Sequence, residues 1–434
     1  MQNVLPVSGQ NSRLFTVVTQ GRVMMYFAFA DYEKNTSFSK YTIQPLPSDF
    51  SITDLDDIIQ DLLVTWGADI GLDLRSDSSG IVKAIFYNSS QIGGTNLVLD
   101  ASYYQESYKS RILNCLATRM GDEERIDYAS KYMKTFKPTD LLWVNLDWDK
   151  ISVFLLSKIG SQDSPDVDVR EFSIENNLTH KDAAKQLQNV VGIHLEKDSI
   201  RNILANVLYR QIMTSTSTEV WDVIRSFVTT SLIKVKDPVF KSFGMKTNDA
   251  HLMITGDIAS VLSPETLFIS VSDGLQLRGR YRVILDQDQV SVILGEALAS
   301  KNFVLPVADL FKNRFLYISS ESDVRTHEGD LSFKGKIESN QGDEGVSEKG
   351  IIGQIGYFHT FDLGGTGRII IDPTNAVYFP NLAREGKNVI ANYANNDDKL
   401  VVDCRKIPVV YGPDESSNLV RIKTWINGLK LKNM

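Results

Sequence analysis

The stretch LLWVNLDWDKISVFLLSKIG, Leu141–Gly160, decides how this chain is organised. Two halves rich in β-branched and aromatic residues flank the polar segment Asn145–Lys150, which is the pattern of a β-hairpin. An earlier stretch, LFTVVTQGRVMMYFAFA at 14–30, has the same pattern around the short turn QGR at 20–22. Because helical patterns follow both hairpins, the sequence predicts an internal repeat of two blocks that open alike.

The first block alternates strands and helices after its hairpin. SITDLDDIIQDLLVTWG at 51–67 has apolar residues at helical spacing, acids in its first turns and a glycine at its end, so it predicts an amphipathic helix. Strands are expected at 81–87 and 96–100, and helices at 104–118 and 123–136. This order predicts an α/β fold.

The second block continues with helices at about 180–192, 197–214 and 217–235, and with a short helix near 288–299. From about 306 the pattern changes to short β-rich pieces separated by turns, which predicts a β-rich C-terminal domain. The polar stretch Ser339–Gly350 is expected to be a mobile loop. Ser417–Leu431 has apolar residues at helical spacing and predicts a closing helix.

Bulk composition excludes several classes of protein. At 434 residues the chain predicts two or three domains, and its net charge of −8 with a pI near 5.3 argues against nucleic-acid binding. Cys115 and Cys404 are too few for a disulfide scaffold or a thiolate metal site. The five histidines never fall three or four residues apart, so no metal site is predicted. There is no export signal and no run of roughly 18 apolar residues, so a cytoplasmic protein without a membrane span is expected.

Several strings follow one another in an order that resembles a known family. They are TIQPLPSDFSITDLDDIIQDLL, SIRNILANVLYRQI, MITGDIASVLSPE, SDGLQLRGRYRVILDQDQVSVILGEALA and KLVVDCRKIPVVYGPDESSNLVRIKTWINGL. The last has an aspartate-x-arginine-x-x-proline strand, then an arginine and a closing tryptophan helix. Together they resemble the accessory proteins of adenosylcobalamin-dependent glutamate mutase, the MutL/GlmL type, over most of the chain and most strongly from about 250 onward. Members of that family are usually longer, so a shortened first half is expected.

The resemblance implies an actin/Hsp70-type ATPase fold, in which two lobes close over ATP and remodel a partner protein. The expected architecture is therefore α/β, with duplicated actin-like (ribonuclease H-like) lobes and a β-rich tail. The first lobe, shortened, is expected at 1–136, and the second, with a helical insertion, at 137–305. The β-rich tail with its closing helix is expected at 306–434.

The first hairpin is where the resemblance places one phosphate-binding turn, with candidate residues Gln20, Gly21 and Arg22. Gly21 is present, but Thr19 replaces the acid that would hold magnesium or its water shell. Arg22 replaces a small hydroxyl residue. It either pairs with phosphate directly or is an exposed arginine in an ordinary hairpin turn.

The second hairpin and the adenosine site supply the other candidate residues, Asp147, Gly256 and Asp257. Asp147 stands where the resemblance predicts a glycine, and Trp148 where it predicts a serine, which adds negative charge and bulk near phosphate. Gly256 is the first glycine of a pair. Asp257 replaces the second, which hinders close approach but leaves an acid that can bond a ribose hydroxyl.

FDLGGTGRIII, 361–371, has the ingredients of a phosphate-binding loop but lies close to the C-terminal end of the chain. Phosphate hairpins of this fold open each lobe and have a long lobe behind them. Gly364 and Gly365 are therefore predicted to form a tight turn between two strands.

Two functions follow from these observations. The first is a pseudo-ATPase, a non-catalytic scaffold or protein-interaction module with no catalytic residue, no metal site and no required cofactor. The alternative is a working ATPase that binds ATP with magnesium and remodels or reactivates a protein such as a cobalamin-dependent mutase. In both cases the expected partner is a protein, and the sequence leaves its identity and the oligomeric state open.

Overall fold

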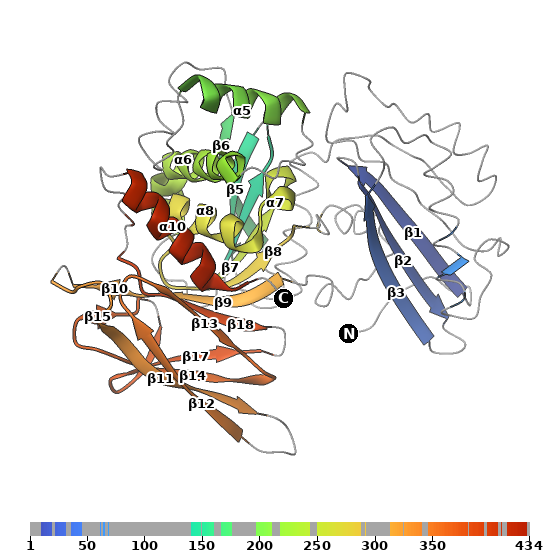
Figure 1. Cartoon of the computed structure of the whole chain (residues 1–434). Helices are drawn as coiled ribbons and strands as arrows, with labels where there is room; N and C mark the ends of the chain where they lie inside the picture. The colour runs from blue at the N-terminus through green and yellow to red at the C-terminus, as the bar shows by residue number, and fades with distance from the viewer. Residues whose placement is uncertain are drawn as a thin grey trace, which may run out of the picture. The chain divides into compact units, whose positions relative to one another are not determined.

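Figure 1 shows the structure, a computed structural model of the whole chain. The residues that it describes are 10–19, 22–31, 36–45, 61, 64, 65, 68, 140–148, 150–159, 166–175, 197–210, 218–243, 250–287, 291, 313–323, 325–340, 346–380, 382–394, 397–406, 409 and 415–431. The chain forms two compact units. The first comprises residues 1–128, 209–213 and 290–305, and the second comprises 129–208, 214–289 and 306–434. The three-domain division expected from the sequence stays a prediction.

The first unit contains a three-stranded antiparallel sheet in the order β1-β2-β3. Its strands are β1 (Gln10–Thr19), β2 (Arg22–Asp31) and β3 (Thr36–Pro45). The Cα partners Thr19 and Arg22 close the hairpin, which confirms the hairpin predicted at 14–30. The helix predicted at 51–67 is helical at the described positions 61, 64 and 65. The elements predicted between 81 and 136 lie outside the described residues.

The second unit is built on an eight-stranded mixed sheet in the order β13-β18-β9-β8-β7-β4-β5-β6 (Figure 1). It begins with an antiparallel meander of β4 (Asp140–Leu146), β5 (Lys150–Ile159) and β6 (Asp166–Glu175), which confirms the hairpin predicted at 141–160. β7 (Ala250–Thr255) pairs parallel to β4, and β8 (Arg280–Leu285) pairs parallel to β7.

Three further strands extend this sheet beyond β8. They are β9 (Asn313–Ser319), β18 (Lys399–Asp403) and β13 (Phe358–Asp362). β9 is antiparallel to β8, β18 is parallel to β9, and β13 is antiparallel to β18. The sheet therefore joins strands that lie far apart in sequence, from the middle of the chain and from its β-rich tail.

Five helices of this unit are α5 (Lys197–Arg210), α6 (Thr218–Phe243), α7 (Asp257–Val261), α8 (Pro264–Leu275) and α10 (Glu415–Leu429). α6 packs against α8 and β5. It confirms the helix predicted at 217–235 but continues through Pro238, because its middle is buried on all sides and packing outweighs the cost of the proline. The helix predicted at 180–192 lies outside the described residues, and that at 288–299 is described only at Ser291, which is helical.

The β-rich tail forms a five-stranded antiparallel sheet in the order β12-β11-β14-β17-β16. Its strands are β11 (Leu331–Asn340), β12 (Val346–Gln354), β14 (Thr366–Pro373), β16 (Ala383–Glu385) and β17 (Asn388–Tyr393). A small two-stranded sheet pairs β10 (Glu321–Ser322) with β15 (Val377–Tyr378). The antiparallel C-terminal sheet confirms the predicted β-rich character of the tail.

The loop predicted at Ser339–Gly350 is wrong at its described positions. Ser339 and Asn340 end β11, and Val346–Gly350 begins β12 in register with it. Lys336 on β11 forms a 2.8 Å ion pair with Glu348 on β12. The polar composition that suggested a loop belongs to two strands that pair across the ladder, in which Ser339 is buried whereas Asn340 and Val346–Gly350 are exposed.

One apolar core lies between the tail sheet and the strands β9 and β18 of the larger sheet. Its buried residues come from both, among them Leu316, Ile318, Phe333, Ile369, Ile371, Leu400 and Val402.

No helix in the described part of the chain is long and apolar enough to cross a membrane. The predicted α/β class is thus confirmed, whereas the pairing of two matching lobes stays a prediction.

Candidate functional site

Three carboxylates follow the carboxyl ends of three neighbouring parallel strands. Asp147 comes directly after β4, Asp286 directly after β8, and Asp257 two residues after β7. The parallel pairing of β4 with β7 and of β7 with β8 brings these ends to one edge of the sheet. That edge is where open α/β sheets bind ligands. The side chains are buried, with 4%, 1% and 6% of Asp147, Asp286 and Asp257 exposed, so each charge needs partners from the protein.

Asp147 connects the β4–β5 turn to the start of α7. Its Oδ1 accepts the backbone N–H of Asp257 at 3.3 Å, and its Oδ2 accepts Nδ2 of Asn145 at 2.7 Å. Its own backbone N–H donates to the carbonyl of Lys150 at 3.2 Å. Both oxygens of the carboxylate therefore have donors from the chain itself.

Gly256 has a structural reason to be glycine. Its φ of 106° and ψ of 176° lie in a region that is essentially restricted to glycine. A Cβ at this position would lie 2.7 Å from the backbone N, C and O atoms of Leu146. The glycine therefore allows the chain to pass β4 at close range where β7 turns into α7.

Asp286 is a site residue that the sequence reasoning missed, together with Thr255. Oγ1 of Thr255 donates to Oδ2 of Asp286 at 3.0 Å, and the backbone N–H of Asp286 donates to the carbonyl of Ile254 at 2.8 Å. The available signal was an acid placed directly after the apolar run VIL at 283–285. Asp147 gives the same signal after β4, so the two acids belong together.

The structure brings three of the predicted site residues together, and the other three belong to the first unit. Asp147, Gly256 and Asp257 lie at the same sheet edge, as the contacts above show. Arg22 is the first residue of β2, and its Cα pairs with that of Thr19. Gln20 and Gly21 lie outside the described residues. Within the described residues, no three His, Cys, Asp or Glu side chains are grouped so that they could hold a metal ion.

The DLGGT stretch forms the predicted turn between strands. It connects β13 with β14 and so passes from the eight-stranded sheet to the five-stranded one. The backbone N–H of Leu363 donates to the carbonyl of Asp398 at 3.0 Å, and the hydroxyl of Tyr393 donates to the carbonyl of Gly364 at 3.3 Å. Gly365 has a φ of 63°, which favours glycine. Gly364 and Gly365 therefore belong to a turn between two strands.

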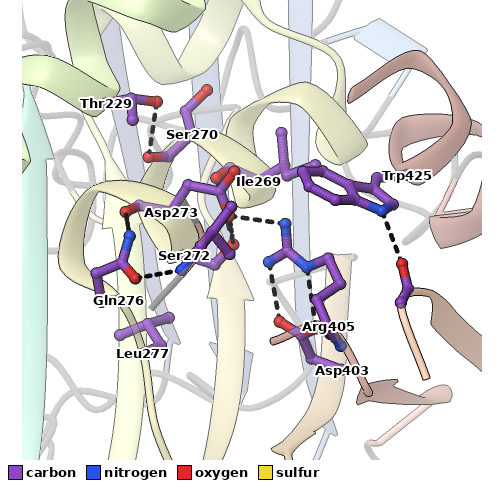
Figure 2. A network of polar contacts seen from close by, with 12 residues as sticks. Thr229, Ile269, Ser270, Ser272, Asp273, Gln276, Leu277, Asp403, Arg405 and Trp425 are labelled. Carbon is purple, nitrogen blue, oxygen red and sulfur yellow. Dashed lines mark hydrogen bonds and ion pairs between the residues drawn. The ribbon is translucent and has the colours of Figure 1, made fainter. Parts of the chain in front are cut away.

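The aspartate-x-arginine motif of the C-terminal strand forms the buried network in Figure 2. Arg405 donates from Nε and Nη2 to the two carboxylate oxygens of Asp403, both at 2.9 Å, and its Nη1 lies 2.8 Å from Oδ1 of Asp273 on α8. All three side chains are at most 2% exposed. The hydroxyl of Tyr317 on β9 also donates to Asp403, at 3.0 Å.

Aromatic rings enclose the same guanidinium. The Arg405 carbon Cζ lies 3.9 Å from the ring centroid of Phe358 and 4.7 Å from that of Trp425, while Trp425 donates from Nε1 to the carbonyl of Gly356 at 2.9 Å. Burial lowers the pKa of Arg405, but the charges of Asp273 and Asp403 outweigh it and raise that pKa overall. Burial, and then the charge of Asp403, raises the pKa of Tyr317. The network therefore joins β18, α8 and α10 at neutral pH.

Comparisons with known proteins give distant structural likeness alone. No family model matches the chain, and no curated protein matches it in sequence. Among solved structures, the ethanolamine utilization protein EutJ from Carboxydothermus hydrogenoformans shares 11% identity, covers 68% of this chain and 90% of its own, and has a TM-score of 0.31. A PilM-PilN type IV pilus biogenesis complex chain shares 11% identity, with coverage of 66% and 98% and a TM-score of 0.32.

A third solved structure is similar at the same level. MreB5 of Spiroplasma citri, bound to ADP, shares 10% identity, with coverage of 67% and 96% and a TM-score of 0.29. At 10–11% identity and TM-scores of 0.32 or less, these three likenesses assign no family to the chain.

Proposed function

We propose that this chain is a non-catalytic actin-like scaffold, a protein-interaction module derived from an ATPase of the glutamate mutase accessory type. The observation that supports this most is the Asp147 carboxylate, which accepts the backbone N–H of Asp257 at 3.3 Å. The resemblance places adenosine at this turn, where the chain would have to leave its polar groups open to the ligand. In this chain a buried carboxylate of the protein takes the donor instead.

The charge at the sheet edge supports the same proposal. Asp147, Asp257 and Asp286 are buried carboxylates at the sheet edge where open α/β sheets bind ligands. Two like unit charges 4 Å apart repel by about 4 kcal/mol at an effective dielectric constant of 20. The described hydrogen bonds of these acids include those from Asn145, Thr255 and the backbone N–H of Asp257.

Under this proposal the fold is retained for its surfaces. The network around Arg405 holds the tail against α8 without any bound molecule, because the charges and hydrogen-bond donors come from the chain itself. The partner is a protein, recognised by the actin-like body and the tail.

The test is thermal unfolding of the full chain with and without Mg-ATP. A ligand at 100 times its dissociation constant adds about 2.7 kcal/mol to the free energy of unfolding, which is a shift of several degrees. The proposal expects no shift at millimolar Mg-ATP. A saturable shift, reproduced by direct binding of a fluorescent ATP analogue, would overturn it.

The alternative is a working ATPase, and the position of Asp147, Asp257 and Asp286 just after neighbouring parallel strands favours it, because open α/β sheets bind ligands at this edge. Carboxylates are ligands that magnesium prefers. If Mg-ATP stabilises the chain, Asp286→Asn is expected to reduce the shift, whereas the exposed control Asp372→Asn keeps it. Phosphate release that is lost in Asp286→Asn and retained in Asp372→Asn would establish the alternative.

A further inference from the structure

The five-stranded tail sheet has two edges of very different length. β12, nine residues long, forms one edge, and β16, three residues long, forms the other. In the described part of the chain, β12 pairs only with β11. A long edge strand presents a row of backbone N–H and C=O groups to a further strand, and natural proteins usually shorten or cover such an edge. β16 is shortened in this way, and β12 is not.

β12 also exposes large apolar side chains. Val346 is 67% exposed and Ile352 is 57% exposed, and both point to the outer face of the sheet together with Glu348, Gly350 and Gln354. Large apolar side chains at this level of exposure are few in the described residues. On the inner face, Ile351 and Gly353 are buried against the core.

We propose that β12 is a self-complementary edge through which two copies of this chain associate, with the two β12 strands pairing antiparallel to form one continuous sheet. A two-fold axis is the usual symmetry of such a dimer, because the same surface then meets itself. Residues opposite each other in an antiparallel pair have their side chains on the same face of the sheet. Side chains alternate between the outer and inner faces along β12, so only registers that match this alternation in both copies are possible.

Charge selects among these registers. An axis through Lys349 would place two lysines opposite each other, and an axis through Glu348 would place two glutamates opposite each other, both of which destabilise a ladder. Axes through Gly350, Ile351 and Ile352 avoid both. Of these, only the axis through Ile351 sets the exposed Ile352 opposite a glycine. It pairs the segment Glu348–Gln354 with itself, sets Glu348 opposite Gln354 and sets Lys349 opposite Gly353 of the second copy.

Shape supports the same register. With the axis at Ile351, Ile352 lies opposite Gly350 of the second copy. A Cβ on Gly350 would meet nothing within 4 Å, so there is open space above this glycine for a neighbouring side chain. The two Ile352 side chains become diagonal neighbours, a distance that long apolar side chains reach across. An exposed isoleucine and an open glycine on the same strand thus complement each other, which favours a second copy of β12 over an unrelated strand.

Sedimentation velocity of the full chain over a concentration series, from about 1 to 100 µM, tests this proposal. The wild-type chain is expected to form a dimer. Ile352→Lys places two lysines at the diagonal contact and is expected to weaken association at least tenfold. Val346→Lys is the matched control, because Val346 is equally apolar and exposed on the same strand but lies outside the paired segment. It is expected to associate like the wild type.

The register is tested by crosslinking. The double variant Gly350→Cys with Ile352→Cys places cysteines opposite each other and is expected to give a disulfide-linked dimer on mild oxidation, whereas Val346→Cys does not. A wild-type chain that stays monomeric throughout would overturn the proposal. A dimer that Ile352→Lys leaves intact, or that Val346→Lys disrupts equally, would also overturn it. The outcome is independent of Mg-ATP, so it is distinct from the test of the scaffold proposal.

Discussion

Arg405 and Asp273 form a buried ion pair that joins the tail to helix α8, with 2.8 Å between Nη1 and Oδ1. The two residues are distant in sequence and both are 2% exposed. Asp403 completes the network from the end of β18. A buried guanidinium with two carboxylate partners and two aromatic faces is strongly constrained in position, so this arrangement fixes how α8, β18 and α10 meet.

Removing the guanidinium is expected to destabilise the second unit severely. Arg405→Met leaves Asp273 and Asp403 buried without their cation, and breaking a buried pair in this way costs about 3–5 kcal/mol. The control is Arg421→Met, which removes an exposed arginine. Arg421 also stacks on Trp425, with 5.1 Å between its Cζ and the ring centroid. Urea unfolding is expected to show a change of less than about 1 kcal/mol for that control. Equal losses for the two variants would contradict this account of the network.

Gly256→Ala is expected to destabilise the chain although it adds one methyl group. The backbone conformation costs a non-glycine residue roughly 1–3 kcal/mol, and the new Cβ would meet Leu146 at 2.7 Å. Gly364→Ala is the matched control, because a Cβ there meets nothing within 4 Å. Thermal or urea unfolding of both variants measures the difference. A neutral Gly256→Ala variant would show that β4 and β7 do not approach as closely as described.

His359 is expected to make stability depend on pH. Burial lowers its pKa, against smaller raising effects of the Gln354 carbonyl and the charge of Asp403. The unfolded chain, with a histidine pKa near 6.5, therefore binds the proton more readily than the folded chain. The stabilising contribution is complete above about pH 6.5 and is lost as the pH falls through the lower folded value.

The measurement is the free energy of unfolding in urea between about pH 5 and 8. The wild type should lose more stability on acidification than His359→Gln, which keeps a polar side chain without the titration. The difference between the two chains isolates His359 from the other histidines. Parallel pH profiles would rule out a lowered pKa at this position.

The thiol of Cys404 is expected to resist modification in the folded chain. Burial raises its pKa to about 12, so very little thiolate is present at neutral pH, and the thiolate is the reactive form. Treatment with iodoacetamide followed by peptide mass spectrometry should find Cys404 unmodified in the native chain and modified in urea. Rapid native alkylation of Cys404 would show that the core around β18 opens readily.

The sequence predicted helices and hairpins correctly where neighbouring residues carry the pattern. The hairpin of β4 and β5 follows from two β-rich halves around a polar turn, and α10 follows from apolar residues at helical spacing. The loop predicted at Ser339–Gly350 failed because polar residues on an exposed strand look the same in composition as a loop. The candidate residues Asp147, Gly256 and Asp257 were found through resemblance, and Asp286 was missed because a single acid after a strand is a weak signal.

The sequence by itself determined the α/β class, the repeated hairpins and the β-rich tail, because side-chain periodicity and turn residues act over a few neighbours. Only the tertiary structure decided that Asp147 would bond the backbone of Asp257, that Gly256 would pass against Leu146, and that Arg405 would meet Asp273. These contacts join residues more than 100 positions apart, and no local pattern encodes which buried charge will find which partner. The order of strands in the eight-stranded sheet decides which of these residues lie close together, and therefore which side chains meet at its edge.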